Sequence, residues 1–136
     1  MSYCALRRKE QVINRSRPAT IYAFDVKKTS NSLYLTNRRV FAMAAVGFPD
    51  GIKVDVFGNV YAGCGDGIEV WNSGGTMIGK ILVEGGVANF SFGRDGELFV
   101  CNERRLWRVQ LAEATKGDLL DGLTVGEEDT MGLGKN

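Results

Sequence analysis

The sequence predicts an all-β fold built from repeated blades, because two similar segments follow each other at a fixed spacing. Residues 49–63 are matched by residues 88–100, about 38 positions downstream, a spacing typical of propeller repeats. In this overlay Gly58 corresponds to Gly96, so turn glycines and strand positions recur together. We therefore predict a fragment of a β-propeller.

Composition agrees with a folded chain that has many tight turns. The 136 residues are 44% apolar, with 18 glycines and only 2 prolines. Abundant glycine serves turns that need a positive φ, whereas linkers would be richer in proline. Disorder of the whole chain is not expected.

Strand patterns account for most of the sequence. Residues 52–83 contain four short strands separated by polar and glycine-rich turns, which makes one complete blade. Two strands precede this blade and three follow it, so about two and a half blades are expected. The predicted strands are residues 20–26, 39–42, 52–55, 60–62, 68–71, 77–83, 87–92, 98–101 and 106–111. Residues 111–120 have a weak helical pattern, and one helical turn near residues 118–120 is the narrower alternative.

Opposite charges collect at the two ends of the chain. Residues 1–20 have five basic residues and one acidic residue, a balance of +4, and acidic residues are in excess from residue 112 onward. We expect a basic flexible N-terminus over residues 1–13, propeller blades over 14–111 and an acidic flexible tail over 112–136. A nucleic-acid-binding arm is the sharper alternative for the basic end, but it lacks interleaved aromatic residues. We predict no nucleic-acid partner.

No apolar run is long enough for a membrane helix, and residues 1–10 are charged where a signal peptide would be apolar. As written, the chain is expected in the cytoplasm, without a membrane partner. Cys4, Cys64 and Cys101 are an odd number without a short paired spacing, which favours buried or free thiols over a disulfide.

Histidine is absent, and this excludes several kinds of catalytic site. Ser-His-Asp and Cys-His nucleophilic machinery and the histidine-based zinc sites all require it. The glycine-rich stretch 63–67 is followed by a strand pattern, whereas a phosphate-binding loop needs a helix behind it. Any chemistry would therefore use carboxylates, amides and backbone groups, which suit a hard cation such as calcium.

Four stretches of the sequence carry a family resemblance. Residues 17–26, 35–41, 49–55 and 58–61, in this order, resemble the family of gluconolactonase, senescence-marker protein and luciferin-regenerating enzyme, nearest to its fungal lactonohydrolase-like members. The resemblance runs from about residue 14 to residue 111. It covers the C-terminal part of that family only.

The resemblance implies a six-bladed propeller that binds one divalent cation, commonly calcium, and hydrolyses lactones. The family's metal ligands are a Glu near its N-terminus, an Asn of a middle blade and the Asp of a Pro-Asp-Gly segment. Asp50 matches the last of these, as metal ligand and catalytic carboxylate, and the other two lie in regions that this chain lacks. Pro-Asp-Gly is also a favoured type I turn sequence. Asn89 and Asn102 are weaker candidates, with strand capping as their alternative.

Two function hypotheses remain at this stage. In the first, the chain is a fragment or truncated gene product of a calcium-dependent lactone hydrolase, inactive alone, whose complete form binds a small-molecule lactone. In the second, it is a non-catalytic propeller segment that associates with itself or a partner through open blade edges and serves as a binding or structural module. Substrate identity is not encoded in the residues that are present.

Overall fold

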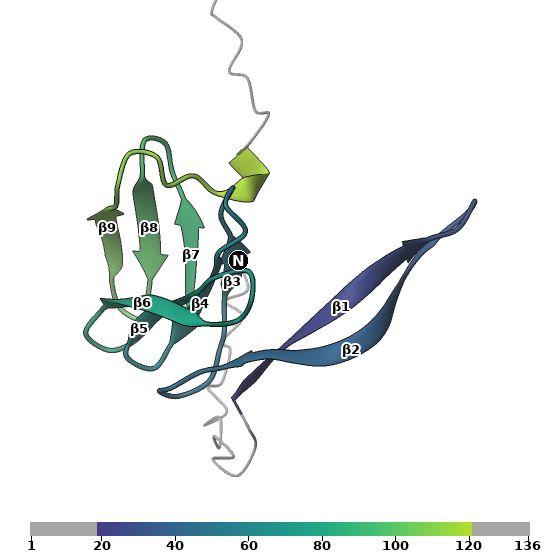
Figure 1. Cartoon of the computed structure of the whole chain (residues 1–136). Coiled ribbons are helices and arrows are strands. Elements are labelled where there is room, and N and C mark those ends of the chain that lie inside the picture. The colour runs from purple at the N-terminus through teal and green to yellow at the C-terminus, as the bar shows by residue number, and fades with distance from the viewer. Residues whose placement is uncertain (1–18, 121–136) are drawn as a thin grey trace, which may run out of the picture.

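Residues 19–120 of the chain are described by a computed structural model, in which almost all regular structure is β-strand (Figure 1). The all-β propeller-fragment prediction is confirmed. Nine strands form three separate antiparallel sheets of two, four and three strands. They are β1 (Thr20–Lys28), β2 (Leu33–Met43), β3 (Ile52–Val54), β4 (Val60–Cys64), β5 (Gly67–Trp71), β6 (Met77–Leu82), β7 (Asn89–Phe92), β8 (Glu97–Cys101) and β9 (Leu106–Gln110).

The four-stranded sheet is the complete blade that the sequence predicts. Strands β3, β4, β5 and β6 pair in chain order, each antiparallel to the next. The glycine-rich stretch 63–67 forms the β4–β5 hairpin, in which Cys64 pairs with Gly67. These glycines therefore serve a two-residue turn, as expected for tight hairpins.

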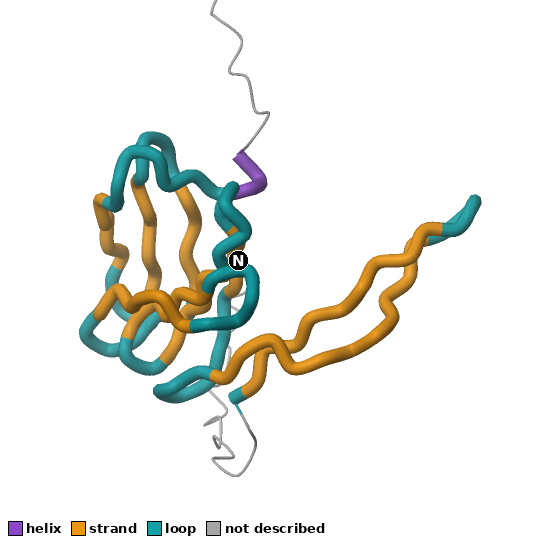
Figure 2. Tube along the Cα trace, viewed as in Figure 1, coloured by secondary structure: helices purple, strands orange, loops and turns teal. Residues whose placement is uncertain are grey.

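The partial blades lie on either side of this sheet in the sequence. Strands β7, β8 and β9 form a three-stranded sheet, and β1 and β2 form a long hairpin that extends away from the other two sheets (Figures 1 and 2). β2 is longer than the predicted strand at residues 39–42, because residues 33–36 also pair with β1. The polar run at residues 37–39 obscures this extension, since both faces of the hairpin are largely exposed there.

Two apolar clusters lie on opposite faces of the complete blade. Alternation along β4 and β5 sends Tyr61, Ile68 and Val70 toward the sheet β7–β9, where they pack with a cluster that includes Phe90 and Leu98. The alternate residues of β4 and β5 face the opposite side, toward the base of the β1–β2 hairpin. This second cluster comprises Ile21, Ala42, Ala62, Cys64 and Trp71. Strands β4 and β5 are therefore buried on both faces, as the central strands of a sheet in a stacked repeat should be.

The segment after β9 returns to β3. Strands β3 and β7 are the first strands of their sheets and contact each other, and we refer to them as the inner strands. Gly117 forms a β-bridge with Asp55, and the amide of Val56 donates to the carbonyl of Lys116 at 2.9 Å. The helical pattern at 111–120 is realised only as a 3-10 turn, η1 (Asp118–Leu120), which confirms the narrower alternative.

Several expectations concern residues outside the described range. The basic terminus at residues 1–13, Cys4 and tail residues 121–136 lie there, so their predicted flexibility stays a prediction. Within the described range Cys64 is a buried free thiol and Cys101 an exposed one. None of the described residues belongs to a helix long and apolar enough to cross a membrane.

Candidate functional site

Asp50 lies in the connection between β2 and β3, immediately before the inner strand of the complete blade. Its amide donates to the carbonyl of Gly63 at 2.9 Å, and the next amide, of Gly51, donates to the carbonyl of Ala88 at 2.8 Å. These bonds extend the pairing with β4 and join the segment to the start of β7. They do not close a Pro-Asp-Gly turn, so the local-turn explanation for this motif lacks its usual hydrogen bond.

Close approach of two blades explains the glycine that follows Asp50. A Cβ atom on Gly51 would lie 2.5 Å from Asn89 Oδ1 and 2.9 Å from Asn89 Cα. No larger residue fits without displacing the start of β7. Gly51 thus holds the beginnings of the inner strands β3 and β7 together, with Asp50 beside this junction.

The carboxylate of Asp50 is exposed, and within the described part of the chain it makes no hydrogen bond or ion pair. Other acidic side chains of the same blade are engaged. Asp66 pairs with Lys80 at 2.9 Å, and the carboxylates of Asp55 and Glu69 are buried among several donors. Among the acidic residues of the range 50–82, Asp50 is therefore the one whose carboxylate is exposed and unengaged.

Asp55, at the end of β3, has a structural role that the sequence analysis missed. Only 2% of the residue is exposed, and its carboxylate accepts four hydrogen bonds. The donors are the amides of Phe57 and Asn59 at 2.9 Å, Asn59 Nδ2 at 2.9 Å and the hydroxyl of Tyr61 at 3.2 Å. The sequence Asp55-Val56-Phe57-Gly58-Asn59, in which an Asp begins a turn that contains Gly-Asn, is a recognisable signal for such a carboxylate-capped turn.

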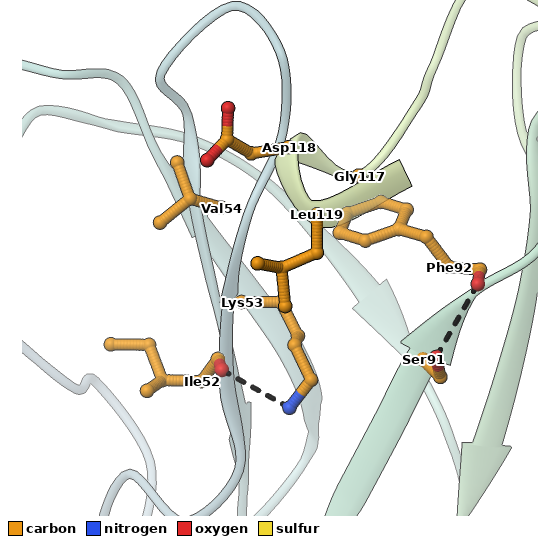
Figure 3. Close-up of a pocket in the computed structure, with 8 residues that line it drawn as sticks. All are labelled: Ile52, Lys53, Val54, Ser91, Phe92, Gly117, Asp118 and Leu119. Carbon is orange, nitrogen blue, oxygen red and sulfur yellow. Dashed lines mark hydrogen bonds between the residues drawn. The ribbon is translucent and has the colours of Figure 1, made fainter. Parts of the chain in front are cut away.

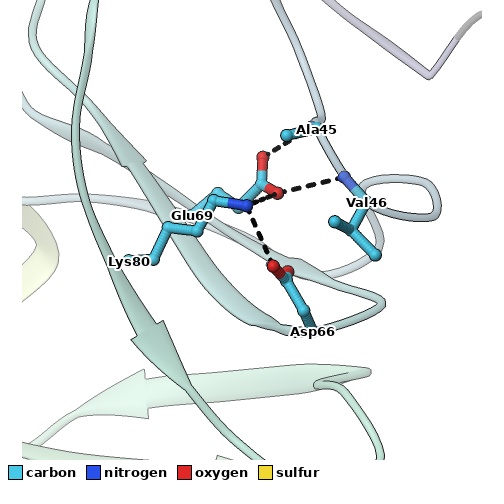
Figure 4. A network of polar contacts seen from close by, with 5 residues as sticks. All are labelled: Ala45, Val46, Asp66, Glu69 and Lys80. Carbon is cyan, nitrogen blue, oxygen red and sulfur yellow. Dashed lines mark hydrogen bonds and ion pairs between the residues drawn. The ribbon is translucent and has the colours of Figure 1, made fainter.

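Glu69 is a second buried carboxylate that was not predicted. It lies in the middle of β5 with no exposed surface. Its carboxylate accepts the amides of Ala45 at 2.9 Å and Val46 at 3.2 Å, and it pairs with Lys80 at 2.9 Å (Figure 4). A charged residue within the apolar run Ile68–Trp71 was the available signal, because buried charges are normally paired.

This network fixes the connection that leads to Asp50. Glu69 binds two consecutive amides of the connection, and the amide of Gly65 donates to the carbonyl of Val46 at 3.0 Å. Lys80 also binds Asp66, and these two hydrogen-bonded carboxylates raise the pKa of its ammonium. The β2–β3 connection is thus attached to the body of the blade four residues before Asp50.

The two weaker candidates differ in their surroundings. Asn102 is engaged in its own turn, because its Oδ1 accepts the amides of Arg104 and Arg105 at 3.0 and 2.9 Å. Asn89 Oδ1 accepts the amide of Phe90 at 2.9 Å and is 3.5 Å from Lys53 Nζ. The capping alternative accounts for Asn102, whereas Asn89 lies at the junction beside Asp50.

A cavity of about 290 Å³ opens between the inner strands β3 and β7 (Figure 3). Ile52, Lys53 and Val54 line it from β3, Ser91 and Phe92 from β7, and Gly117, Asp118 and Leu119 from the returning segment. Most of this lining is apolar, with one ammonium and one carboxylate. Such a cavity has the size and character of a small-molecule site.

No three His, Cys, Asp or Glu side chains within residues 19–120 gather closely enough to hold a metal ion. Asp50 is an exposed, unengaged oxygen donor, but calcium takes six to eight oxygen ligands. The described residues therefore fit one ligand position and do not form a complete cation site.

Tyr61, next to Asp55, and Cys64, next to Glu69, are buried groups that should make the stability of the fold decrease at alkaline pH. Burial, with the nearby charge of Asp55, raises the pKa of Tyr61 from 10.0 to about 12, and burial, with Glu69 and Asp66 nearby, raises the pKa of Cys64 from 9.0 to about 12. The folded state keeps both protons where the unfolded state has lost them. This stabilisation is therefore complete below pH 9 and is lost as pH rises to about 12.

Denaturant unfolding at a series of pH values tests this expectation. The free energy of unfolding should decline from about pH 9 in the native sequence. Cys64→Ala should remove the part of the decline that begins first, and its curve should start to fall nearer pH 10. Parallel curves for the two proteins would contradict the assignment to Cys64.

Known proteins that are similar to the chain include a lactonohydrolase and a gluconolactonase. The chain is 33% identical over 100 residues to a lactonohydrolase of Aspergillus oryzae, a match that covers 72% of the chain and 21% of that protein. A gluconolactonase from Xanthomonas campestris has a similar structure, with a TM-score of 0.60, 29% identity, and coverage of 72% of this chain and 30% of that one. No protein-family model matches the chain.

A second solved structure, a candidate gluconolactonase, has a TM-score of 0.62 at 21% identity and covers 73% of this chain and 33% of its own. At that identity the likeness shows the fold alone. The chain thus spans about a fifth of the curated relative and about a third of each similar structure.

Proposed function

We propose that this chain, which is similar to part of the gluconolactonase-like proteins, supplies Asp50 to a lactone-hydrolysing site. One observation carries the proposal: Asp50 is exposed and unengaged at the junction of the two inner strands, while Asp55, Asp66 and Glu69 of the same blade are used structurally. The similar lactonohydrolase and gluconolactonase support the reaction class.

Asp50 would act as one ligand of a divalent cation, which we propose to be calcium. The remaining ligands would come from blades of a complete propeller outside residues 14–111. A bound cation would serve as a Lewis acid toward the lactone carbonyl. Asp50 would also orient the attacking water or accept its proton, a task for which a carboxylate needs hydrogen-bond reach and a free lone pair.

We predict that the isolated chain does not hydrolyse lactones and binds calcium weakly. Affinity for calcium follows the number and charge of its oxygen ligands, and no three acidic side chains of the described residues gather at one site. Asp50→Asn should weaken the remaining calcium binding by about tenfold or more. Calorimetric titration with calcium, alongside hydrolysis of glucono-lactone, measures both quantities.

Asp95→Asn is the matched control, because Asp95 is another exposed carboxylate, in the turn between β7 and β8. It should leave calcium binding unchanged. Calcium affinity that is equal in Asp50→Asn and the native chain would refute the ligand assignment. Substantial calcium-dependent turnover by the native chain, abolished in Asp50→Asn, would refute its inactivity.

A second candidate function is self-association, and the β1–β2 hairpin favours it. Within the described residues β1 pairs only with β2, and large apolar side chains of the hairpin are exposed. Val26 and Leu35, which face each other across the two strands, are 64% and 62% exposed. An apolar sheet surface and an open edge of this kind usually contact another chain or blade.

The corresponding prediction is that the chain forms dimers or larger species at micromolar concentration. The double variant Val26→Thr and Leu35→Thr keeps β-branched or small strand residues but removes apolar area, so it should shift the species toward monomer. Phe57→Ser removes an equally exposed apolar side chain away from the hairpin and serves as the control. Sedimentation velocity that shows a compact native monomer would exclude this function.

A further inference from the structure

Lys53, the middle residue of β3, carries a positive charge that has no ion-pair partner among the described residues. Its side chain is half-buried, and it forms no ion pair with any carboxylate in residues 19–120. The ammonium lies 3.2 Å from the carbonyl of Ile52 and 3.5 Å from Asn89 Oδ1, both uncharged acceptors. A partly buried cation of this kind normally has an anion nearby.

The same contacts place this charge at the junction that contains Asp50. Asn89 packs directly against Gly51, the residue after Asp50, and it is also the side-chain partner of Lys53. Lys53 faces the same side of the blade as Tyr61, its partner across the β3–β4 pair. Its ammonium is 5.6 Å from the centre of the Phe90 ring. It is therefore held from both inner strands.

Lys53 is one of the residues that line the cavity described above (Figure 3). Phe92 and Leu119 supply apolar walls, and the hydroxyl of Ser91 donates to the carbonyl of Phe92. Asp118 also lines the cavity, and Figure 3 shows its carboxylate at the opposite end of the view from the Lys53 ammonium. A mostly apolar cavity with an ammonium at this end suits a small organic anion, because the ammonium binds the acid group and the walls contact the carbon chain.

Hydrolysis of a lactone breaks the ring's acyl C–O bond, adds the elements of water and releases a proton. A neutral substrate thereby becomes a hydroxycarboxylate anion. We infer that Lys53 binds the carboxylate of this hydroxy acid and makes the site selective for it over a neutral polyol. The inference rests on the proposed function for the identity of the anion, and it concerns binding alone.

The test is calorimetric titration of the full chain with D-gluconate, with the neutral polyol sorbitol and inorganic phosphate as comparison ligands. Gluconate should bind more tightly than either. Lys53→Met, which keeps most of the apolar stem, should weaken gluconate binding by about tenfold or more. Lys53→Arg keeps the charge and should stay within about threefold. Circular dichroism establishes that both variants fold.

Equal affinity for gluconate and sorbitol, no measurable gluconate binding, or unchanged binding in Lys53→Met would overturn the inference. Phosphate that binds as tightly as gluconate would also overturn it, since the site would then recognise charge without a carbon chain. Asp50→Asn separates the two proposals. Calcium binding that is insensitive to Asp50→Asn removes the proposed metal role, whereas the gluconate results stand by themselves because the titration contains no metal.

Discussion

Replacement of Asp55 by alanine should destabilise the chain by about 3–5 kcal/mol, because four hydrogen bonds to one buried carboxylate are lost together. The amides of the β3–β4 turn can regain water if the turn opens. The Tyr61 hydroxyl is less able to do so, since it lies in the buried cluster between the two blades. Urea unfolding followed by tryptophan fluorescence measures the change.

Asp55→Asn makes the experiment more specific. An amide group in place of the carboxylate directs its own N–H groups at donors that include Asn59 Nδ2 and Tyr61, so we expect a loss of about 2 kcal/mol without any change in volume. Asp95→Asn is the same substitution in the corresponding hairpin of the next blade, where the side chain is exposed, and should have little effect. Equal losses at the two positions would disprove the role of the Asp55 network.

The blades were predictable from sequence because their pairing is local. Each strand of β3–β6 pairs with the next one along the chain, so apolar alternation and turn glycines contain most of the required information. The same alternation in β4 and β5 also separates the two apolar clusters. The long extension of β2 was missed because the polar run at residues 37–39 separates residues 33–36 from the predicted strand, and the strand is largely exposed on both faces there.

The candidate site was less predictable, because its contacts join residues distant in the sequence. Gly51 reads as a turn glycine, but its small size is required by Asn89, which lies across the blade junction. Glu69 appears as an isolated charge in a strand, and its partners at residues 45 and 46 are more than twenty positions away. Asp50 was found only through family resemblance, and the structure adds that its carboxylate is unengaged.

Loss of Glu69 should weaken both the fold and the placement of Asp50. Glu69→Ala removes the acceptor for two consecutive amides of the β2–β3 connection and the partner of Lys80. It also leaves a cavity in a side-chain position that has no exposed surface. We expect a loss of about 2–4 kcal/mol in the free energy of unfolding. Lys80 keeps Asp66 as its second partner, which limits the cost on that side.

Hydrogen exchange distinguishes a local release of the connection from general destabilisation. The amides of Ala45, Val46 and Asp50 should exchange faster in Glu69→Ala by a larger factor than the amides of β8, because the connection is attached to the blade through Glu69. Glu69→Gln keeps the volume and one acceptor oxygen, so its effect should be intermediate. Glu97→Ala is the matched control, since it removes a carboxylate whose partner, Arg108, is largely exposed, and such pairs contribute about 1 kcal/mol or less. A uniform increase across both sheets in Glu69→Ala would show that Glu69 stabilises the blade without specifically holding the Asp50 connection.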